Sequence, residues 1–84
     1  MSGLLAYGRM ADAHWREYLP LMVRDLEAQG RLQQALIEAQ EQATAEMDRL
    51  IRDLSRQGLN PQQAHDRAWE LVREKYLLLP PEQT

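Results

Sequence analysis

The chain has no cysteine, which excludes disulfide bonds and metal sites built from thiolates. No stretch approaches ~18 consecutive apolar residues, so the sequence predicts no helix that spans a membrane. The opening residues, MSGLLAYGRM, do not combine a basic region with a long apolar stretch, and they therefore predict no secretory signal. Together these absences predict a protein of the cytoplasm.

Runs of like charge are absent as well, and acidic residues outnumber basic ones. The 84 residues include 13 Asp and Glu against 10 Lys and Arg, which gives a formal net charge of −3. Non-specific nucleic-acid binding depends on basic residues that release counterions from phosphates, so this balance disfavours it. A chain this short also buries little core, and either regular helix packing or a partner must supply the missing stability.

The stretch over residues 31–57 contains neither glycine nor proline and is rich in residues that favour helix. Its apolar positions, separated by three or four residues, are Leu32, Leu36, Ala39, Ala43, Met47, Leu50 and Leu54. This spacing has the helical period and repeats about every eleven residues. We therefore predict one long amphipathic helix at the centre of the fold.

Helical periodicity also begins near Arg9 or Met10, ahead of the long helix. The apolar residues with this spacing are Ala11, Trp15, Tyr18, Met22 and Leu26. Pro20 interrupts them, and two interpretations are open, because a proline either kinks a helix or occupies the first turn of a new one. The unbroken apolar spacing across Pro20 favours a single kinked helix over residues 10–29.

Gly30 and Gly58 are predicted to end helices, since glycine adopts the left-handed conformation at little cost. After Gly58, the pair Asn60 and Pro61 is typical of a helix N-terminus, because asparagine caps helices and proline suits their first turn. A last helix is therefore predicted over about residues 61–76, joined to the long helix by a tight turn.

The sequence thus predicts an all-α protein: a small three-helix bundle with a kinked first helix, a long central helix and an apolar C-terminal tail. Gly3 and Gly8 weaken helix formation at the start, so residues 1–8 are predicted to form an N-terminal strap. The helical domain then covers residues 9–79. Residues 80–84, which begin with two prolines, form the C-terminal tail.

Groups that carry catalytic or metal chemistry are few. His14 and Glu17 share one helical face, but one such pair is half of a metal site, and a surface position is the favoured interpretation of His14. Ser2 and Ser55 have no base at a suitable spacing, and the four glycines do not form a phosphate-binding loop. We therefore predict no catalytic residue, metal, cofactor or small-molecule substrate.

The sequence favours a non-catalytic adaptor or regulator that acts through protein–protein contact. Large aromatic side chains anchor interfaces well, although they equally form the core of a small bundle. The aromatic candidates are Trp15, Tyr18, Trp69 and Tyr76. The aliphatic candidates are two isoleucines beside the main stripe of the long helix and three leucines that either cap the bundle or bind a partner: Ile37, Ile51, Leu77, Leu78 and Leu79. A second copy of the chain, in a homodimer, is one alternative for the partner.

A DNA-associated accessory factor is the runner-up, because the joint at residues 58–61 separates two helices as in helix–turn–helix proteins. The basic residues of this alternative are Arg49, Arg52, Arg56 and Arg67. Acidic residues interleave with them, which is typical of a solvated surface. The protein-contact hypothesis is therefore preferred.

Residues 7–54 carry several recognisable positions: the segment YGRM at 7–10, the segment GRL at 30–32, and Leu26, Leu36, Ala43, Met47, Leu50 and Ile51. With them the chain resembles small transposon-encoded proteins of the TnpV type. It departs from that family in having Pro20 and fewer residues between the long and the last helix. The resemblance implies a small helical accessory protein of bacterial mobile DNA, phage or plasmid, and it carries over no catalytic or binding residue.

Overall fold

The computed structural model describes residues 4–82, and the regular structure within them is helical. Four α-helices and a short π-helical turn follow one another: α1 (Ala6–Tyr18), α2 (Pro20–Ala28), α3 (Leu32–Arg56), α4 (Pro61–Val72) and η1 (Arg73–Leu77). The predicted all-α class is therefore confirmed. No helix within residues 4–82 combines the length and the apolar character that a membrane span requires.

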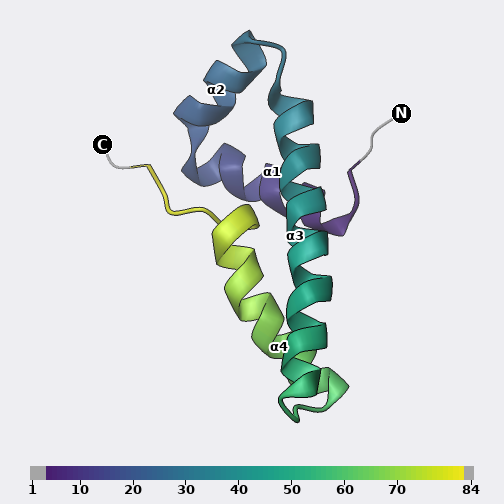
Figure 1. The fold of residues 1–84 in the computed structure, drawn as a ribbon. Coiled ribbons are helices and arrows are strands. Elements are labelled where there is room, and N and C mark those ends of the chain that lie inside the picture. Colours follow the sequence, from purple (N-terminus) through teal and green to yellow (C-terminus); the bar gives the residue numbers. More distant parts are fainter. Residues whose placement is uncertain (1–3, 83–84) are drawn as a thin grey trace.

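The long helix α3 is the element on which the others pack (Figure 1). α4 runs antiparallel along its C-terminal half, α1 crosses it near its middle, and α2 lies beside its N-terminal part (Figure 1). Its predicted apolar stripe faces these neighbours: Leu32, Leu36, Ala39, Ala43 and Met47 are buried, and Leu50 and Leu54 are half-buried. The long amphipathic helix is therefore confirmed.

Both predicted glycine corners are present. Gly58 has a φ of +104°, in the region that side chains with a Cβ avoid, and its N–H donates to the carbonyl of Ser55 (3.1 Å). The N–H of Leu59 donates to the carbonyl of Leu54 (3.2 Å), which completes the double hydrogen bond of a glycine C-terminal cap. The same arrangement ends α2 at Gly30, whose φ is +67°.

The start of α4 is specified by its own sequence. The Asn60 side chain accepts a hydrogen bond from the Gln63 N–H (2.9 Å), and the Gln63 side chain accepts one from the Asn60 N–H (3.1 Å). These two reciprocal bonds form a capping box, and Pro61 occupies the first turn, where its missing N–H costs nothing. The helix continues into η1 and ends at Leu77, one residue beyond the predicted end.

The single kinked helix over residues 10–29 is not confirmed, because α1 and α2 are separate helices joined at Leu19. Leu19 has φ −132° and ψ 50°, outside the helical region, since a following proline disfavours the helical conformation. Pro20 then begins α2. The buried residues about the break are Trp15, Leu19 and Val23, whereas Tyr18 of the predicted spacing is 42% exposed and Met22 and Leu26 are half-buried. The predicted spacing therefore does not mark one continuous buried face.

α1 begins at Ala6, before the predicted start near Arg9, so residues 6–8 of the predicted strap are helical. Gln40 of α3 explains this early start: its Oε1 accepts hydrogen bonds from the N–H groups of Leu5 and Gly8. A Cβ at Gly8 would lie 2.6 Å from that oxygen, so glycine allows α1 to approach α3 closely. Residues 1–3 of the strap lie outside the described residues.

The described chain is flat. Its Cα atoms extend over 46 × 33 × 14 Å, and their radius of gyration is 14.4 Å. A compact domain of this length has a radius of gyration of about 12 Å. A depth of 14 Å accommodates about two packed helices, so no third layer within the described chain covers the side of α3 that faces away from its neighbours.

Candidate interaction surfaces

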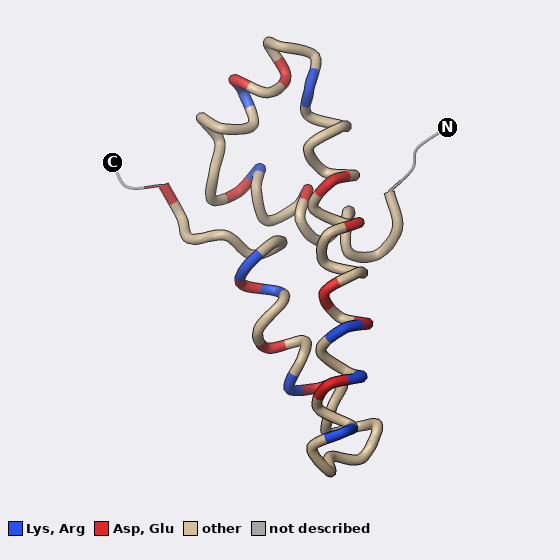
Figure 2. Tube along the Cα trace, in the orientation of Figure 1, with Lys and Arg blue, Asp and Glu red and all other residues tan. Residues whose placement is uncertain are grey.

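Acidic and basic side chains alternate along α4, whereas the charged residues of α3 are acidic from Glu38 to Asp48 and of both signs from Arg49 to Arg56 (Figure 2). Within residues 4–82, no three His, Asp or Glu side chains lie close enough together to hold a metal ion. His14 is half-buried instead of lying on the open surface, and its Nε2–H donates to the carbonyl of Leu79 (2.7 Å). Its ring also packs against that of Tyr18, with centroids 4.7 Å apart.

The arginines considered for DNA binding are all exposed. Three of the four form ion pairs with acids one helical turn away: Arg49 with Glu46 and Asp53, Arg56 with Asp53, and Arg67 with Glu70. The hydrogen bond from Arg49, 2.7 Å long, lowers the pKa of the Glu46 carboxyl below its usual value. Exposed pairs of this kind stabilise a helix modestly and reduce the positive charge that a phosphate would meet.

Trp15 and Leu77, both predicted to contact a partner, belong to the core. Trp15 is 5% exposed and Leu77 is 0% exposed. The indole Nε1–H of Trp15 donates to the carbonyl of Leu77 (3.0 Å), so its one polar group is satisfied inside the protein. Neither side chain can reach a partner in this conformation.

The remaining aromatic candidates lie closer to the surface. Tyr18 is 42% exposed, and Trp69 and Tyr76 are half-buried. The Trp69 ring stacks on that of Tyr7 with centroids 5.2 Å apart, which joins α4 to α1. Lys75 Nζ lies 5.1 Å from the centroid of the Tyr76 ring. Trp69 therefore contributes chiefly to packing between helices, and Tyr18 is the most accessible of the aromatic candidates.

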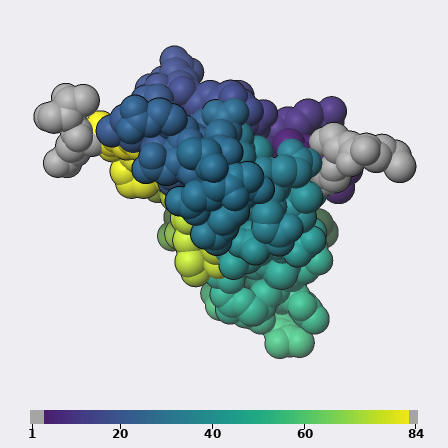
Figure 3. Space-filling view, turned by 90° about the horizontal axis from the view of Figure 1, so that it is seen from above, coloured from purple at the N-terminus to yellow at the C-terminus, as the bar shows by residue number. Residues whose placement is uncertain are grey.

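Leu78 and Leu79 are half-buried and pack against the core. They follow η1 and continue into a segment that runs along the junction of α1 and α2; in Figure 3 these yellow residues lie against the blue ones. The three leucines were predicted either to cap the bundle or to bind a partner, and their positions in the structure correspond to capping.

The two isoleucines occupy one flank of α3, together with Thr44 between them. Ile37 and Ile51 are both half-buried; Ile51 packs against the core, whereas Ile37 lies outside the buried cluster. Residues seven apart differ by about two helical turns, so these three positions form a row along the helix. We call the row Ile37, Thr44 and Ile51 the α3 flank.

Two hollows open along the α3 flank. The first, with a volume of about 180 Å³, is predominantly apolar and is lined by Leu5, Ala6, Tyr7, Gln40 and Thr44. Leu5 is 68% exposed at its rim, the largest exposed fraction among the large apolar side chains within residues 4–82. This hollow joins the start of α1 to the middle of α3.

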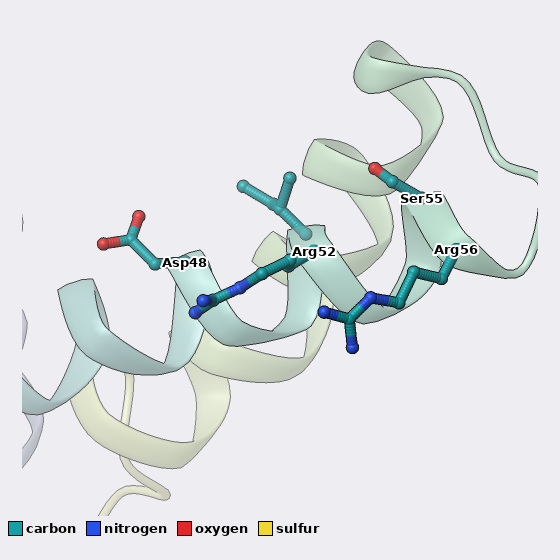
Figure 4. A pocket seen from close by; sticks show the side chains of 5 residues that line it. Asp48, Arg52, Ser55 and Arg56 are labelled. Carbon is teal, nitrogen blue, oxygen red and sulfur yellow. The ribbon is translucent and has the colours of Figure 1, made fainter.

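The second hollow lies nearer the end of α3 and is lined by Asp48, Ile51, Arg52, Ser55 and Arg56 (Figure 4). Asp48, Arg52 and Arg56 lie about one turn apart along this one helix, and Ser55 directly precedes Arg56 (Figure 4). Because a single helix supplies the whole lining, the hollow is an open depression of the surface. Its mixed charges suit a polar rim around the apolar row better than a site for one anion.

Two contacts at helix N-termini were not predicted from the sequence. Gln40 accepts hydrogen bonds at the start of α1, and Glu82 accepts them at the start of α2 from the N–H groups of Leu21 (3.1 Å) and Met22 (2.9 Å). The one available signal was that the residues before these helices, Leu5 and Leu19, have apolar side chains that cannot cap.

Comparisons with protein-family models, with curated proteins and with solved structures return no match for this chain.

Proposed function

We propose that this protein is a non-catalytic helical adaptor or regulator that acts by protein–protein contact through the α3 flank. The observation that carries the proposal is the flat arrangement of the helices. With a Cα depth of 14 Å, no further helix within residues 4–82 covers the side of α3 that faces away from its neighbours, and the α3 flank, with its two half-buried isoleucines and exposed Thr44, lies at the edge of that side. A partner helix laid against it would cover the apolar groups that the chain itself leaves in contact with water.

The accessible apolar groups near the row support the same surface. Leu5, 68% exposed, stands beside an apolar hollow that also includes Thr44 of the α3 flank. The polar residues Arg52 and Arg56 lie at the other end, near Ile51. An apolar centre with a charged edge is the usual composition of a protein interface.

A second copy of the chain is the simplest partner, since a two-fold axis at Thr44 would bring Ile37 of one copy to Ile51 of the other. Both isoleucines lie seven residues from Thr44, so an antiparallel pair of α3 helices is self-complementary in these positions. The link to bacterial mobile DNA that the TnpV resemblance implies stays a hypothesis about the setting in which the contact occurs.

The proposal is tested by the mass in solution of the wild-type chain and of the double variant Leu5→Gln, Ile37→Gln. As the protein concentration is raised to about 1 mM, the mass of the wild type is expected to exceed the 9.8 kDa of a monomer. A dimer with a Kd of about 1 mM has a binding free energy of about 4 kcal/mol. The double variant should be monomeric. The matched control Leu71→Gln changes a residue that is 50% exposed on α4 and should leave the mass unchanged.

A wild type that stays monomeric throughout this range, and that retains no partner which the double variant loses, would contradict the proposal. A separate titration of the wild type with duplex DNA at about 50 mM salt tests the runner-up, because phosphate contacts are strongest at low salt. Variants of Trp15 or Leu77 are unsuitable, since both side chains belong to the core.

A further inference from the structure

The C-terminal residues cross the junction of α1 and α2 in an extended form and are held there by specific hydrogen bonds. We call residues 78–82 the C-terminal segment and residues 14–22 the elbow. His14 Nε2–H donates to the carbonyl of Leu79 (2.7 Å), and the Glu82 N–H donates to the carbonyl of Tyr18 (3.0 Å). These partners lie more than sixty residues apart in the sequence, so the contact belongs to the tertiary fold.

The carboxylate of Glu82 completes the first turn of α2. Pro20, the first residue of this helix, has no N–H, and the N–H groups of the next two residues have no acceptor within the helix. Leu21 donates to Glu82 Oε1 (3.1 Å) and Met22 donates to Oε2 (2.9 Å). Leu19, at the capping position, has no side-chain acceptor of its own. The negative charge also lies at the positive end of the helix dipole.

The C-terminal segment is suited to binding in an extended form. Pro80 and Pro81 have restricted backbones and no N–H groups, so the segment loses little conformational freedom when it is held and leaves few donors unsatisfied. Leu79 precedes a proline, which favours extended backbone at that position too. The segment thus presents its carbonyl at Leu79 and its carboxylate at Glu82 in fixed positions along the elbow.

The helix that receives the carboxylate has little other support. α2 is nine residues long, and Val23 is its one buried residue. An isolated helix of this length does not persist in water. The state of α2 should therefore depend on whether the elbow is occupied.

We propose that the elbow is a binding site for an extended segment that carries a glutamate, that the C-terminal segment of this chain is its resident occupant, and that this occupancy controls whether α2 stays folded. This site is separate from the α3 flank and does not depend on the function proposed for it. A partner that offers an extended acidic segment of the same kind would compete for the elbow and would release the C-terminal residues.

Amide hydrogen exchange of the full chain tests the proposal residue by residue. In the variant Glu82→Ala, exchange in α2 should become about five- to thirtyfold faster, as expected for the loss of a helix cap. Exchange in α3 and α4 should not change. The matched control Glu74→Ala removes an exposed glutamate of η1 and should leave exchange in α2 as in the wild type.

A second variant of full length, with glycine and serine in place of residues 78–82, tests binding in trans. A synthetic peptide of residues 78–82, at about 1 mM, should restore slow exchange in α2, and a peptide with Glu82→Ala should not. Unchanged exchange in α2 of the Glu82→Ala chain, or no restoration by the glutamate peptide, would overturn the proposal. An equal acceleration in α2, α3 and α4 would also overturn it, because the segment would then stabilise the whole fold and would not act on α2.

Discussion

Replacement of Gly8 by alanine tests the packing of α1 on α3, because two physical effects predict opposite signs. In a helix with free space, alanine stabilises by about 1 kcal/mol relative to glycine. At Gly8 the added Cβ would lie 2.6 Å from Gln40 Oε1 and 2.7 Å from a terminal carbon of Leu4. Real Cβ contacts are longer than this, so a neighbour must move.

The close approach should outweigh the helix preference. Overpacking in a well-packed site costs about 1–3 kcal/mol. Gln40 is buried, and its Oε1 accepts the N–H groups at the start of α1, so its displacement also weakens that cap by about 1 kcal/mol. After the helix preference of alanine is subtracted, Gly8→Ala should lower the free energy of unfolding by about 1–3 kcal/mol.

Urea unfolding followed by circular dichroism measures the effect, and a double-mutant cycle identifies its cause. In a Gln40→Ala background the oxygen is gone, so Gly8→Ala should cost at least about 1 kcal/mol less than in the wild type. Ala13→Gly, at an exposed position of α1, is the control for helix preference and should destabilise by about 1 kcal/mol. A Gly8→Ala chain that is more stable than the wild type would refute the close packing of α1 on Gln40.

Three further variants test single interactions by the same unfolding measurement. Trp15→Phe removes the hydrogen bond to the Leu77 carbonyl and leaves that buried acceptor without its partner, so it should cost about 1–3 kcal/mol; a change within error would contradict the bond. Gly58→Ala places a Cβ at a φ of +104° and should destabilise by about 1–2 kcal/mol, although nothing lies within 4 Å of the added atom. Arg49 lowers the pKa of Glu46, so their pair stabilises the fold above about pH 4.5, and this stabilisation is lost as the pH falls through the lowered pKa. Arg49→Met should therefore reduce the loss of stability on acidification. An unaltered pH profile would exclude the pair as a contributor to stability.

The parts of the fold that the sequence predicted are those in which all the determining residues are neighbours along the chain. The end of α3 at Gly58 and the start of α4 at Asn60 depend on bonds between residues at most five positions apart. The apolar stripe of α3 is likewise a local pattern, and it predicted the bounds of the helix to within one residue at each end. Local signals of this kind are visible without knowledge of the tertiary fold.

The single kinked helix predicted across Pro20 is not confirmed, and the reason lies in which residues are buried. Apolar spacing across the proline indicated one continuous helical face, yet a chain that turns sharply packs both arms on a common core through a different set of residues. The buried residues about this turn are Trp15, Leu19 and Val23, whereas Tyr18 of the predicted face is 42% exposed. Periodicity alone cannot separate these cases, whereas the restriction that proline places on Leu19 decides between them.

The aromatic candidates could be assigned to the core or to the surface only from the tertiary fold, whereas the isoleucines of α3 could be identified from the sequence. Trp15 was a candidate because tryptophan anchors interfaces, but the Leu77 carbonyl that accepts its indole N–H lies sixty-two positions away. Ile37 and Ile51 were identified from the angular spacing of a single helix, which needs no tertiary information, and both remain partly accessible. Leu5, the most exposed large apolar side chain within residues 4–82, lines one hollow with Thr44 of the α3 flank because of how α1 crosses α3.

The helices fall into two pairs that differ in whether their ends are capped by neighbouring residues or by distant ones. α4 carries its own cap in Asn60 and Gln63, and α3 ends at its own glycine. α1 and α2 begin after residues that cannot cap, and they take their acceptors from Gln40 and Glu82, thirty-five and about sixty positions away. The hairpin of α3 and α4 is thus specified locally, whereas α1 and α2 are completed only when distant segments dock on them. Any partner that acts on this protein by changing its conformation would therefore act with least cost on α1 and α2, where displacement of a single acceptor removes the support of a whole helix N-terminus.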